Sequence, residues 1–277
     1  MTSKTWFITG ASSGFGNAFA RHALSQGHNV VATARNADKL KDLHLEAPDR
    51  VLALTLDVTR PGDAERAVAA AIERFGAIDV LINNAGYAIV GTIEETPEAE
   101  LRALMETNFF GAAAVTKAAL PNMRERRSGA IVNISSMGGQ MSFPTVGAYS
   151  ATKFALEGYS EALAREVRPF GIKVLIVEPG AFRTSLLGNG DRFMPALDAY
   201  RELTAGVRQA MKDMDGTQAG DPIKAAAVIE KALDAETTPL RLALGADAID
   251  AIRDHAKGLI AELEAWQAVG IDTRLDG

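Results

Sequence analysis

The stretch Thr5–Gly16, with the sequence TWFITGASSGFG, decides the fold. Its first five residues are mostly apolar or β-branched and predict a short buried strand over Thr5–Thr9. The residues from Phe15 to Ser25 predict a helix. Three glycines lie at the junction, and glycine allows a tight turn in which a helix approaches a strand closely. The chain therefore opens with a strand, a glycine-rich turn and a helix.

This glycine-rich turn predicts a dinucleotide-binding site. The N-terminus of a helix offers free N–H groups and the positive end of a dipole to a pyrophosphate. Glycines also let the backbone approach the phosphates. The candidate cofactor-binding residues of the turn are Gly10, Ser12, Ser13, Gly14, Phe15 and Gly16. The alternative is a plain tight turn without a ligand.

Strands and helices alternate along the chain. Short apolar runs predict further strands at Val30–Ala34, Val51–Leu56, Val80–Asn83, Ala130–Ile134, Lys173–Val177 and Leu240–Leu244. Further helices are predicted at Ala37–Leu43, Gly62–Phe75, Pro97–Arg126, Ala148–Arg168, Pro222–Leu233 and Ala246–Trp266. Alternation of this kind implies a parallel sheet. The predicted fold class is therefore α/β, a Rossmann-type doubly wound sheet of about seven strands with helices on both faces.

Residues 181–220 interrupt the alternation and contain no convincing strand. An amphipathic helix is expected there, with one apolar stripe formed by Leu197, Tyr200, Leu203, Val207 and Met211. We expect residues 1–277 to form a single domain in which residues 181–220 are a helical flap.

Composition excludes several classes of partner. The chain has 277 residues, a net charge of −6, no cysteine and four scattered histidines. We therefore expect no nucleic-acid partner, because the net charge is negative, and no metal ion, because the histidines lack the paired spacing of metal ligands. No apolar run approaches the ~20 residues of a membrane span, and no signal peptide is evident. We expect a cytoplasmic protein with no membrane partner.

The end of the second predicted strand indicates which dinucleotide binds. NAD sites commonly place an acidic residue here, bonded to the ribose 2′-hydroxyl, whereas this chain has Arg35. A guanidinium binds a 2′-phosphate through a charge-assisted hydrogen bond of about 1.5–3 kcal/mol. That energy predicts an about 10- to 150-fold preference for NADP(H) over NAD(H). The alternative is that Arg35 is a solvated loop residue.

Four motifs together resemble those of the short-chain dehydrogenase/reductase family. They are Thr9-Gly10-x-x-x-Gly14-x-Gly16, Asn83-Asn84-Ala85-Gly86, Tyr149-x-x-x-Lys153 with Ser136 thirteen residues upstream, and Pro179-Gly180. Each motif is modestly specific alone, and their order and separations are highly specific together. The resemblance covers about residues 4–185. It implies an oxidoreductase that moves a hydride between NADP(H) and an alcohol or carbonyl group.

Tyr149 and Lys153 are suited to proton transfer. Their i,i+4 spacing places both on one face of the predicted helix. A tyrosine with a pKa of about 10 is a poor base at neutral pH. An ammonium about 4 Å away contributes about 4 kcal/mol at an effective dielectric constant of 20, enough to bring the phenol pKa near 7. Such a phenol gives a proton to a forming alkoxide or takes one from an alcohol. The alternative is a surface pair on an amphipathic helix.

Ser136 and Asn108 complete the candidate catalytic set. Ser136 ends the fifth predicted strand, where its hydroxyl can hydrogen-bond the substrate oxygen. Ser135 is the competing choice, and the family spacing favours Ser136. The resemblance implies that Asn108 kinks its helix and holds a water that links Lys153 to solvent. The alternative is a solvent-facing asparagine.

The resemblance implies further cofactor contacts. Asp57, followed by Val58, resembles the acid that accepts a hydrogen bond from the adenine amino group. Asn84, Ala85 and Gly86 would pass along the nicotinamide ribose, the alternative being a strand end closed by glycine. Tyr149 and Lys153 would also contact the cofactor, as would Pro179, Gly180, Phe182 and Thr184 near the carboxamide. Phe15 and Phe182 stand where the family more often has aliphatic residues.

The remaining expectations concern substrate and partners. Met141, Phe143 and Val146, with the apolar residues of the flap, favour a medium-sized hydrophobic alcohol, ketone or aldehyde. The alternative is that these side chains pack on the body of the protein. The resemblance implies a homodimer or homotetramer that pairs through the long fourth and fifth helices. Two other functions stay open: a non-catalytic NADP(H)-binding redox sensor, and a family member that acts on an acyl thioester or a sugar.

Overall fold

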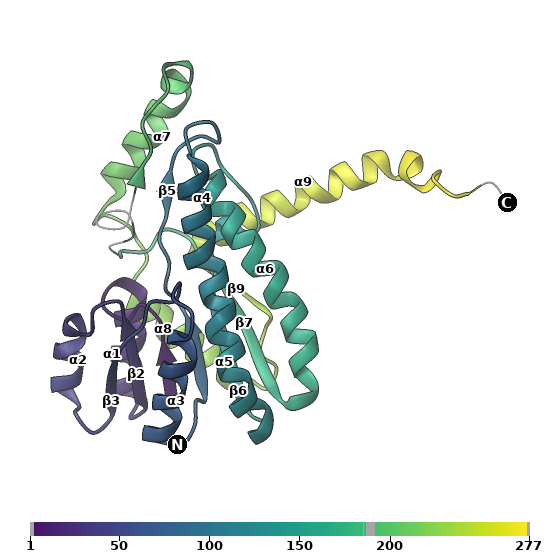
Figure 1. Cartoon of the computed structure of the whole chain (residues 1–277). Helices are drawn as coiled ribbons and strands as arrows, with labels where there is room; N and C mark the ends of the chain where they lie inside the picture. The colour runs from purple at the N-terminus through teal and green to yellow at the C-terminus, as the bar shows by residue number, and fades with distance from the viewer. Residues whose placement is uncertain (1–2, 185, 187–191, 276–277) are drawn as a thin grey trace.

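The computed structural model describes residues 3–184, 186 and 192–275. A seven-stranded parallel sheet with the order β3-β2-β1-β4-β6-β7-β9 forms its centre (Figure 1). The strands of this sheet are β1 (Thr5–Ile8), β2 (Asn29–Ala34), β3 (Val51–Thr55), β4 (Val80–Asn83), β6 (Gly129–Ile134), β7 (Ile172–Pro179) and β9 (Arg241–Leu244). The predicted doubly wound sheet of about seven strands is confirmed.

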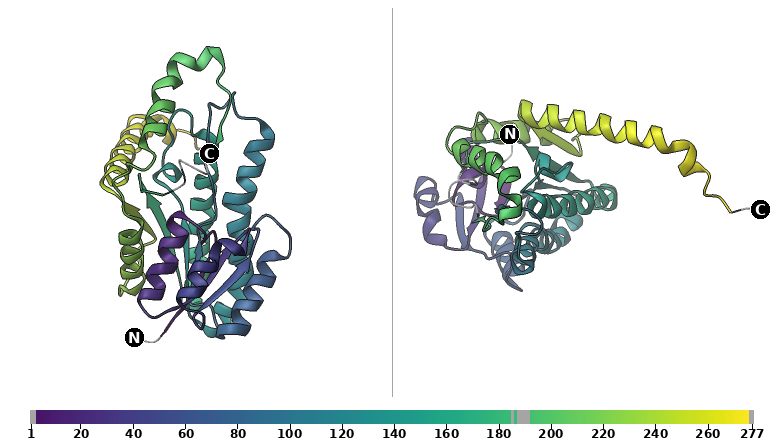
Figure 2. Two further views of the ribbon diagram at one scale, coloured as in Figure 1. Left: turned by 90° about the vertical axis from the view of Figure 1, so that its left-hand side faces the viewer. Right: turned by 90° about the horizontal axis from the view of Figure 1, so that it is seen from above.

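Helices cover both faces of this sheet (Figure 1, Figure 2). They are α1 (Gly14–Ser25), α2 (Lys41–Glu46), α3 (Asp63–Phe75), α4 (Glu98–Met105), α5 (Gly111–Arg126), α6 (Gly147–Val167), α7 (Arg201–Met214), α8 (Pro222–Asp234) and α9 (Ala246–Ile271). Their ends follow local chemistry. The Asp221 carboxylate caps α8 by accepting from the Ile223 amide at 2.8 Å, and Pro222 occupies the first helical turn.

Side chains that point alternately to the two faces of the sheet divide the core into two layers. Trp6 and Ile8 of β1 pack toward α1, α2 and α8, whereas Phe7 between them packs toward α3, α5 and α6. Successive side chains of a strand point to opposite faces, so strands covered on both sides read as continuous apolar runs.

The structure corrects two expectations. The helix predicted over Pro97–Arg126 is two helices, α4 and α5, joined by a π-helical turn η2 (Glu106–Phe110). The region from 181 to 220 does contain a strand, since β8 (Arg192–Phe193) pairs in parallel with β5 (Ile89–Val90). Two-residue strands carry no periodicity, so the sequence gives no signal for them. The amphipathic helix expected in this region is α7, on which Leu203 is 63% exposed.

Two features project from the body. α7 rises beyond the carboxyl ends of the strands, and most of α9 extends away as an isolated helix (Figure 1, Figure 2). Among the described residues no helix has the length and hydrophobicity needed to cross a membrane. The described residues also include no group of three or more His, Asp or Glu side chains arranged to hold a metal ion.

Candidate active site

The candidate residues gather at the carboxyl edge of the parallel sheet. Each candidate segment directly follows a strand: the glycine-rich turn follows β1, Asn84–Gly86 follows β4, Ser136 follows β6 and Gly180 follows β7. Parallel strands end at the same edge, which is where open α/β sheets bind ligands. The fold therefore brings together segments that are far apart in the sequence.

The glycines of the first turn are required by its geometry. Gly10 and Gly14 have φ values of +68° and +51°, which side chains rarely adopt. A Cβ atom on Gly16 would lie 2.3 Å from the Gly10 carbonyl oxygen and 2.7 Å from Asn84 Nδ2. Only glycine at position 16 lets α1 start this close to the strands. Its first N–H groups, which lack partners within the helix, are therefore free for an anion.

Thr9 and Asn84 tie this turn to the segment after β4. The Thr9 hydroxyl accepts from the Asn84 and Ala85 amides, both at 2.9 Å. Asn84 Nδ2 donates to the carbonyls of Thr9 at 2.9 Å and Gly10 at 3.2 Å. The Asn84 side chain therefore holds the turn in place, and Ala85 and Gly86 are left to line the edge of the sheet.

A hollow of about 470 Å³ lies in front of the glycine-rich turn. Its lining residues are Ser12, Ser13, Gly14, Asn17, Ala18, Arg183, Thr184, Pro222 and Ile223. The exposed cation Arg183 lies in this lining and was not among the candidates predicted from the sequence. The hollow therefore combines helix amides, hydroxyls and a guanidinium, which suits phosphate oxygens.

The Phe15 and Phe182 side chains pack against each other rather than toward this hollow. Their ring centroids are 5.1 Å apart, and Phe15 also stacks on Phe19 at 5.4 Å. Next to Phe182, a Cβ on Gly180 would lie 2.2 Å from an oxygen of Asp247, which accepts from the Ala181 amide at 2.7 Å. Any contact of Phe15, Gly180 or Phe182 with a cofactor therefore involves backbone.

Arg35 and Asp57 lie beyond the ends of β2 and β3. Arg35 is exposed. Burial acts to raise the pKa of Asp57, but hydrogen bonds from Thr59 and the charges of Arg60 and Arg35 outweigh it and hold this pKa below its ordinary value. Arg35 is thus close enough to Asp57 to stabilise its carboxylate, so the two side chains are neighbours at the ends of β2 and β3. Val58, in contrast, packs against Gly111 of α5.

Two of the four candidate catalytic residues, Ser136 and Tyr149, meet next to Gly138. The position of a Cβ on Gly138 would be 3.4 Å from Ser136 Oγ and 3.7 Å from Tyr149 Cε1, so these two side chains face the same small space. The Gly138 amide donates to Ser136 Oγ at 3.0 Å, which fixes the hydroxyl. Ser135, the competing serine, is buried beside Gly139 instead.

Lys153 lies beside the Tyr149 ring. Its ammonium lies 5.6 Å from the centroid of the Tyr149 ring and donates to the Ile134 carbonyl at 2.7 Å. Burial lowers the pKa of Lys153 to about 8, against the opposing effect of the Glu157 carboxylate. Because this value lies above 7, the side chain is mostly cationic at neutral pH. The interpretation of Tyr149 and Lys153 as a solvated surface pair is excluded, since Lys153 is 6% exposed.

Asn108 is 2% exposed, which excludes the solvent-facing alternative. It lies in the π-helical turn η2, where the helix is interrupted as expected. Its Nδ2 donates to the Tyr87 carbonyl at 3.0 Å and to Thr152 Oγ1 at 3.1 Å, and its Oδ1 accepts from the Tyr87 amide at 3.1 Å. Thr152 in turn donates to the Tyr149 carbonyl at 2.7 Å. Asn108 therefore connects η2 to the helical turn that carries Tyr149 and Lys153.

A buried charge cluster behind Lys153 was not predicted. Arg241 Nε lies 3.0 Å from Glu157 Oε2 and 3.5 Å from Glu178 Oε1, and Gln140 Nε2 donates to Glu178 at 2.6 Å. Burial raises the pKa of both carboxyl groups, that of Glu178 to about 7. The only signal in the sequence is the i,i+4 spacing of Glu157 and Lys153, since Glu178 and Arg241 come from distant strands.

A second unpredicted pair holds the flap to the body. The side chain of Glu95 is fully buried and pairs with Arg208 of α7 at 2.6 Å. Glu95 also accepts from the Leu197 amide at 2.9 Å, and Arg208 donates to the Met194 carbonyl at 2.8 Å. Met194 packs with Ile89, Leu104 and Ala148 in an apolar cluster that touches Tyr149. The described part of the flap therefore lies against the candidate catalytic tyrosine; residues 185 and 187–191 of it lie outside the described residues.

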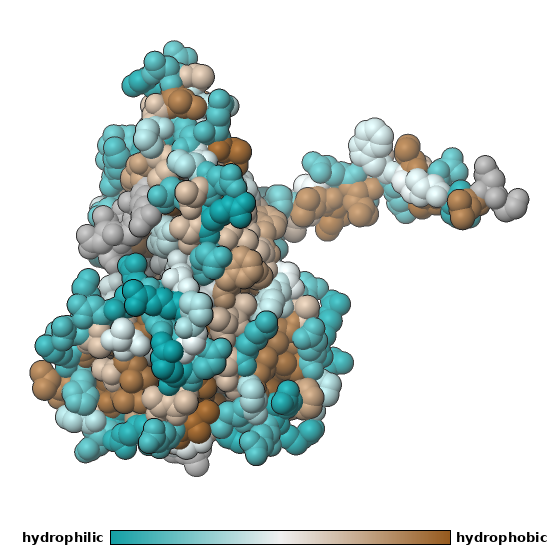
Figure 3. Space-filling model, in the orientation of Figure 1, coloured by the Kyte–Doolittle hydropathy of each residue, from teal (hydrophilic) through white to brown (hydrophobic). Residues whose placement is uncertain are grey.

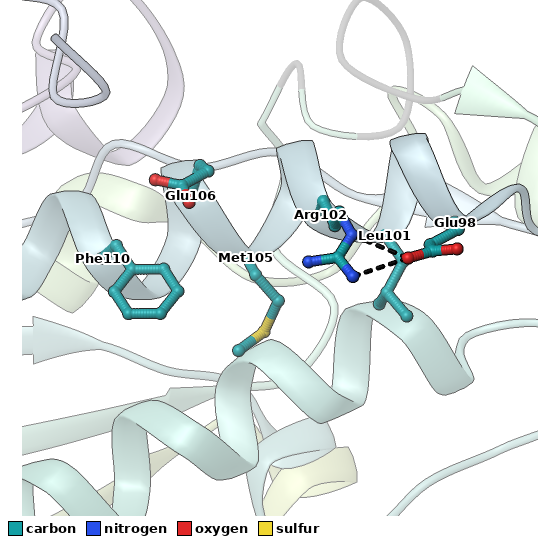
Figure 4. A pocket seen from close by; sticks show the side chains of 6 residues that line it. All are labelled: Glu98, Leu101, Arg102, Met105, Glu106 and Phe110. Atoms are coloured by element: carbon teal, nitrogen blue, oxygen red, sulfur yellow. Dashed lines mark hydrogen bonds and ion pairs between the residues drawn. The ribbon is translucent and has the colours of Figure 1, made fainter.

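Another hollow, of about 460 Å³, lies on the outer face of α4 and η2 (Figure 4). Its lining residues are Glu98, Leu101, Arg102, Met105, Glu106 and Phe110. None of the candidate catalytic or cofactor-binding residues lines it. This hollow is therefore separate from the candidate active site.

Comparison with known proteins assigns the family. The family model described as short chain dehydrogenase matches residues 4–193. A crystal structure of a short-chain dehydrogenase from Streptomyces avermitilis is 52% identical, with a TM-score of 0.93 over 99% of this chain and 100% of that one. A 3-ketodihydrosphingosine reductase from Bacteroides thetaiotaomicron is 50% identical over 66% of this chain and 65% of its own length.

A more distant solved structure shows a bound cofactor. An alcohol dehydrogenase from Thermococcus sibiricus, in complex with 5-hydroxy-NADP, is 25% identical, with a TM-score of 0.72 over 88% of this chain and 96% of its own. The chain belongs to the short-chain dehydrogenase family of oxidoreductases.

Proposed function

We propose that this protein reduces a hydrophobic ketone or aldehyde with NADPH, and catalyses the reverse oxidation, with Tyr149 as the acid and base. The observation that carries the proposal is the convergence of Ser136, Tyr149, Lys153 and Asn108 at the carboxyl edge of the sheet, beside the glycine-rich turn. A serine hydroxyl, a phenol and a buried cation around one small space are what carbonyl reduction needs.

The side chains have distinct roles in this scheme. A bound nicotinamide supplies the hydride. The Ser136 hydroxyl holds the carbonyl oxygen of the substrate, and the Tyr149 hydroxyl gives its proton to that oxygen as the alkoxide forms. The Lys153 ammonium stabilises the phenolate that remains, because it is cationic and largely desolvated. Asn108 acts by positioning, since it fixes the helical turn that carries the other two.

The residues present fit a dinucleotide. The positive φ values of Gly10 and Gly14 and the absence of a side chain at Gly16 open the first turn of α1 to a pyrophosphate. Arg183 and Thr184 line the same hollow. Arg35 is exposed at the end of β2, where it would bind the 2′-phosphate of NADP, and Asp57 beside it would accept from adenine. We therefore assign NADP(H) as the preferred cofactor.

The substrate side of the site is apolar. Met194 and Ile89 form a buried cluster against which Tyr149 packs, and the flap is fixed over this cluster by Glu95 and Arg208. The name of the Bacteroides relative indicates a ketone on a long-chain base as its substrate. Both points support a hydrophobic carbonyl compound rather than a sugar.

The outer face of α4, η2 and α6 supports self-association. Phe110 and Phe154 are 51% and 47% exposed, and Phe110 lines the hollow shown in Figure 4. Exposed aromatic side chains beside a hollow are typical of an interface. We assign this face to pairing of two copies of the chain.

The experiment is an equilibrium titration of the purified protein with NADPH and NADH, in the wild type, in Arg35→Ala and in the control Lys39→Ala. NADPH is expected to bind about 10- to 150-fold more tightly than NADH, and Arg35→Ala is expected to remove the difference. Lys39→Ala, which removes another exposed cation nearby, is expected to keep it. Failure of both nucleotides to bind below millimolar concentration would overturn the proposed enzyme.

A further inference from the structure

Three charged side chains lie enclosed in the protein: Lys153, Glu157 and Glu178. Each is 6% exposed or less, whereas hydrophilic residues usually lie on the surface, as the teal residues of Figure 3 do. Burial disfavours the charged form of each group, so its charge depends on its neighbours. The proposed role of Tyr149 requires a cation beside it, and the groups that keep Lys153 charged therefore bear on the reaction.

The two enclosed carboxyl groups meet at one cation, Arg241 of β9. Its Nε lies 3.0 Å from Glu157 Oε2 and 3.5 Å from Glu178 Oε1, so both carboxyl groups lie against the same nitrogen. Its Nη2 pairs with the more exposed Glu161 of α6 at 3.0 Å. One guanidinium therefore faces three carboxyl groups, and this excess of acid favours a proton on one of them.

Glu178 is the carboxyl group that carries this proton below about pH 7. Burial raises the pKa of Glu157 and of Glu178, the latter to about 7. A hydrogen bond between the two favours the acid form of Glu178 and the carboxylate of Glu157. Arg241 lies closer to Glu157, and the Ser135 hydroxyl also favours the Glu157 carboxylate. Glu157 is therefore the ionised member of the pair.

The Glu157 carboxylate acts on Lys153. The two residues are one helical turn apart on one face of α6, and the carboxylate opposes the burial that lowers the pKa of Lys153 to about 8. Glu178 and Arg241 act on Glu157 in turn. The other groups that contact these side chains from the neighbouring elements are the Tyr149 ring of α6, the Ile134 carbonyl of β6 and the Gln140 amide. The charge of Lys153 is therefore linked to the proton on Glu178 through Glu157.

We propose that Glu157 is a positioning residue for the reaction: its carboxylate keeps Lys153 cationic, and Glu178 keeps Glu157 ionised by holding the proton that the two carboxyl groups share. This inference rests on the proposed roles of Tyr149 and Lys153. As pH rises past about 7, Glu178 loses its proton and adds a second negative charge, just below the pH at which Lys153 would lose its own. The pair therefore resists the loss of the Lys153 charge on the alkaline side.

The first test measures the ionisation of Lys153 without turnover, by NMR of protein labelled with ¹³C at lysine Cε and free of nucleotide. The Lys153 signal is assigned by its absence in Lys153→Arg. Its titration midpoint is expected near pH 8 in the wild type and about 1–3 pH units lower in Glu157→Gln. Glu157→Asp, which keeps the charge, is expected to shift the midpoint less.

Glu161→Gln is the matched control for this titration. It removes a carboxylate that pairs with the same Arg241 but lies a further turn from Lys153 on α6, and it is expected to keep the wild-type midpoint. An unchanged midpoint in Glu157→Gln would overturn the proposal, whether or not the protein reduces a carbonyl compound.

The second test is the pH profile of carbonyl reduction. If the rate follows the cationic fraction of Lys153, Glu157→Gln is expected to be about 5- to 500-fold slower than the wild type at pH 8 and to approach the wild-type rate as the pH falls. A merely structural defect would lower the rate by the same factor at every pH, and that result would contradict the assigned role. A wild type that reduces no carbonyl compound would contradict the proposed function, and the lysine titration would still decide this inference.

The third test locates the shared proton in protein labelled with ¹³C at the glutamate carboxyl carbon. The signals are assigned by their absence in Glu157→Asp and Glu178→Asp. In the wild type the Glu178 carboxyl group is expected to titrate near pH 7, with Glu157 already ionised at pH 6. Two ionised carboxyl groups at pH 6 would overturn the shared proton, and this measurement does not require Glu157→Gln to fold.

Discussion

Replacing Gly16 by alanine tests the geometry of the glycine-rich turn most sharply. The new Cβ would lie 2.3 Å from the Gly10 carbonyl oxygen and 2.7 Å from Asn84 Nδ2. Both neighbours are held in place, since Asn84 is hydrogen-bonded to Thr9 and Gly10. The start of α1 must therefore move away from the strands by about 1 Å to restore van der Waals contact.

The expected magnitude follows from overpacking. Inserting one carbon into a tightly packed region costs about 1–3 kcal/mol. A chain of this size loses about 2–4 °C of Tm per kcal/mol. If the displaced turn must return to its original position to hold a pyrophosphate, the same energy weakens NADPH binding by about 5- to 150-fold. Both effects are expected in Gly16→Ala.

The assay combines thermal unfolding with fluorescence titration by NADPH. Gly158→Ala is the matched control, because it lies in α6 and a Cβ there would meet no heavy atom within 4 Å. Alanine at that helical position is expected to keep or raise Tm by the equivalent of about 0.5–1 kcal/mol, with unchanged NADPH affinity. Wild-type Tm and affinity in Gly16→Ala would refute the argument that this site requires glycine.

Two further predictions concern buried polar groups. Asn108→Ala removes three hydrogen bonds that link Tyr87 to α6, and it is expected to cost about 1–3 kcal/mol in the free energy of unfolding and to slow turnover. The control Asn122→Ala on α5 removes two longer hydrogen bonds, from the Ile78 amide and Arg126 at 3.4 Å each, and is expected to cost less and to leave turnover unchanged. Thermal unfolding and initial rates check both variants, and an active Asn108→Ala of wild-type Tm would contradict the assigned role. Burial raises the pKa of Glu178 from 4.5 to about 7, so the folded protein holds this proton more tightly than the unfolded chain, and the free energy of unfolding falls as pH rises through that interval. Denaturant unfolding measured from pH 4.5 to 7.5 checks this: the free energy of unfolding is expected to fall less with rising pH in Glu178→Gln than in the wild type. Glu161→Gln is the control and is expected to keep the wild-type pH dependence, because Arg241 holds the pKa of Glu161 below its ordinary value. Identical pH slopes in wild type and Glu178→Gln would contradict this assignment.

Much of the fold was predictable because its signals are local. Each strand of the central sheet is a short apolar run that ends at a polar or glycine-rich segment, and the observed strand ends differ from the predicted ones by two residues or fewer. Gly10, Gly14 and Gly16 were predictable for the same reason, since a strand, turn and helix adjacent in sequence form one unit. The sequence therefore predicts where the site lies.

The missed features depend on contacts between distant segments. Glu95 and Arg208 are more than one hundred residues apart and each has the charge of an ordinary surface residue, yet together they fix the flap. Glu178 and Arg241 meet only because β7 and β9 are neighbours in the sheet. The amphipathic pattern of α7 was predictable, whereas the burial of Thr204 on this helix was not. Amphipathicity identifies a helix without identifying what covers it.

The most direct test of hydride transfer with Tyr149 as the acid uses NADPH that carries two deuterium atoms at C4 of the nicotinamide, incubated with a panel of hydrophobic ketones and aldehydes. The wild type is expected to give an alcohol that is one mass unit heavier than the alcohol made with ordinary NADPH. Tyr149→Phe is expected to form it about 10²- to 10⁴-fold more slowly, with NADPH affinity within a few-fold of wild type. A Tyr149→Phe variant that transfers deuterium at the wild-type rate would contradict the assigned mechanism, and a wild type that binds NADPH but labels no carbonyl compound would contradict the proposed reaction.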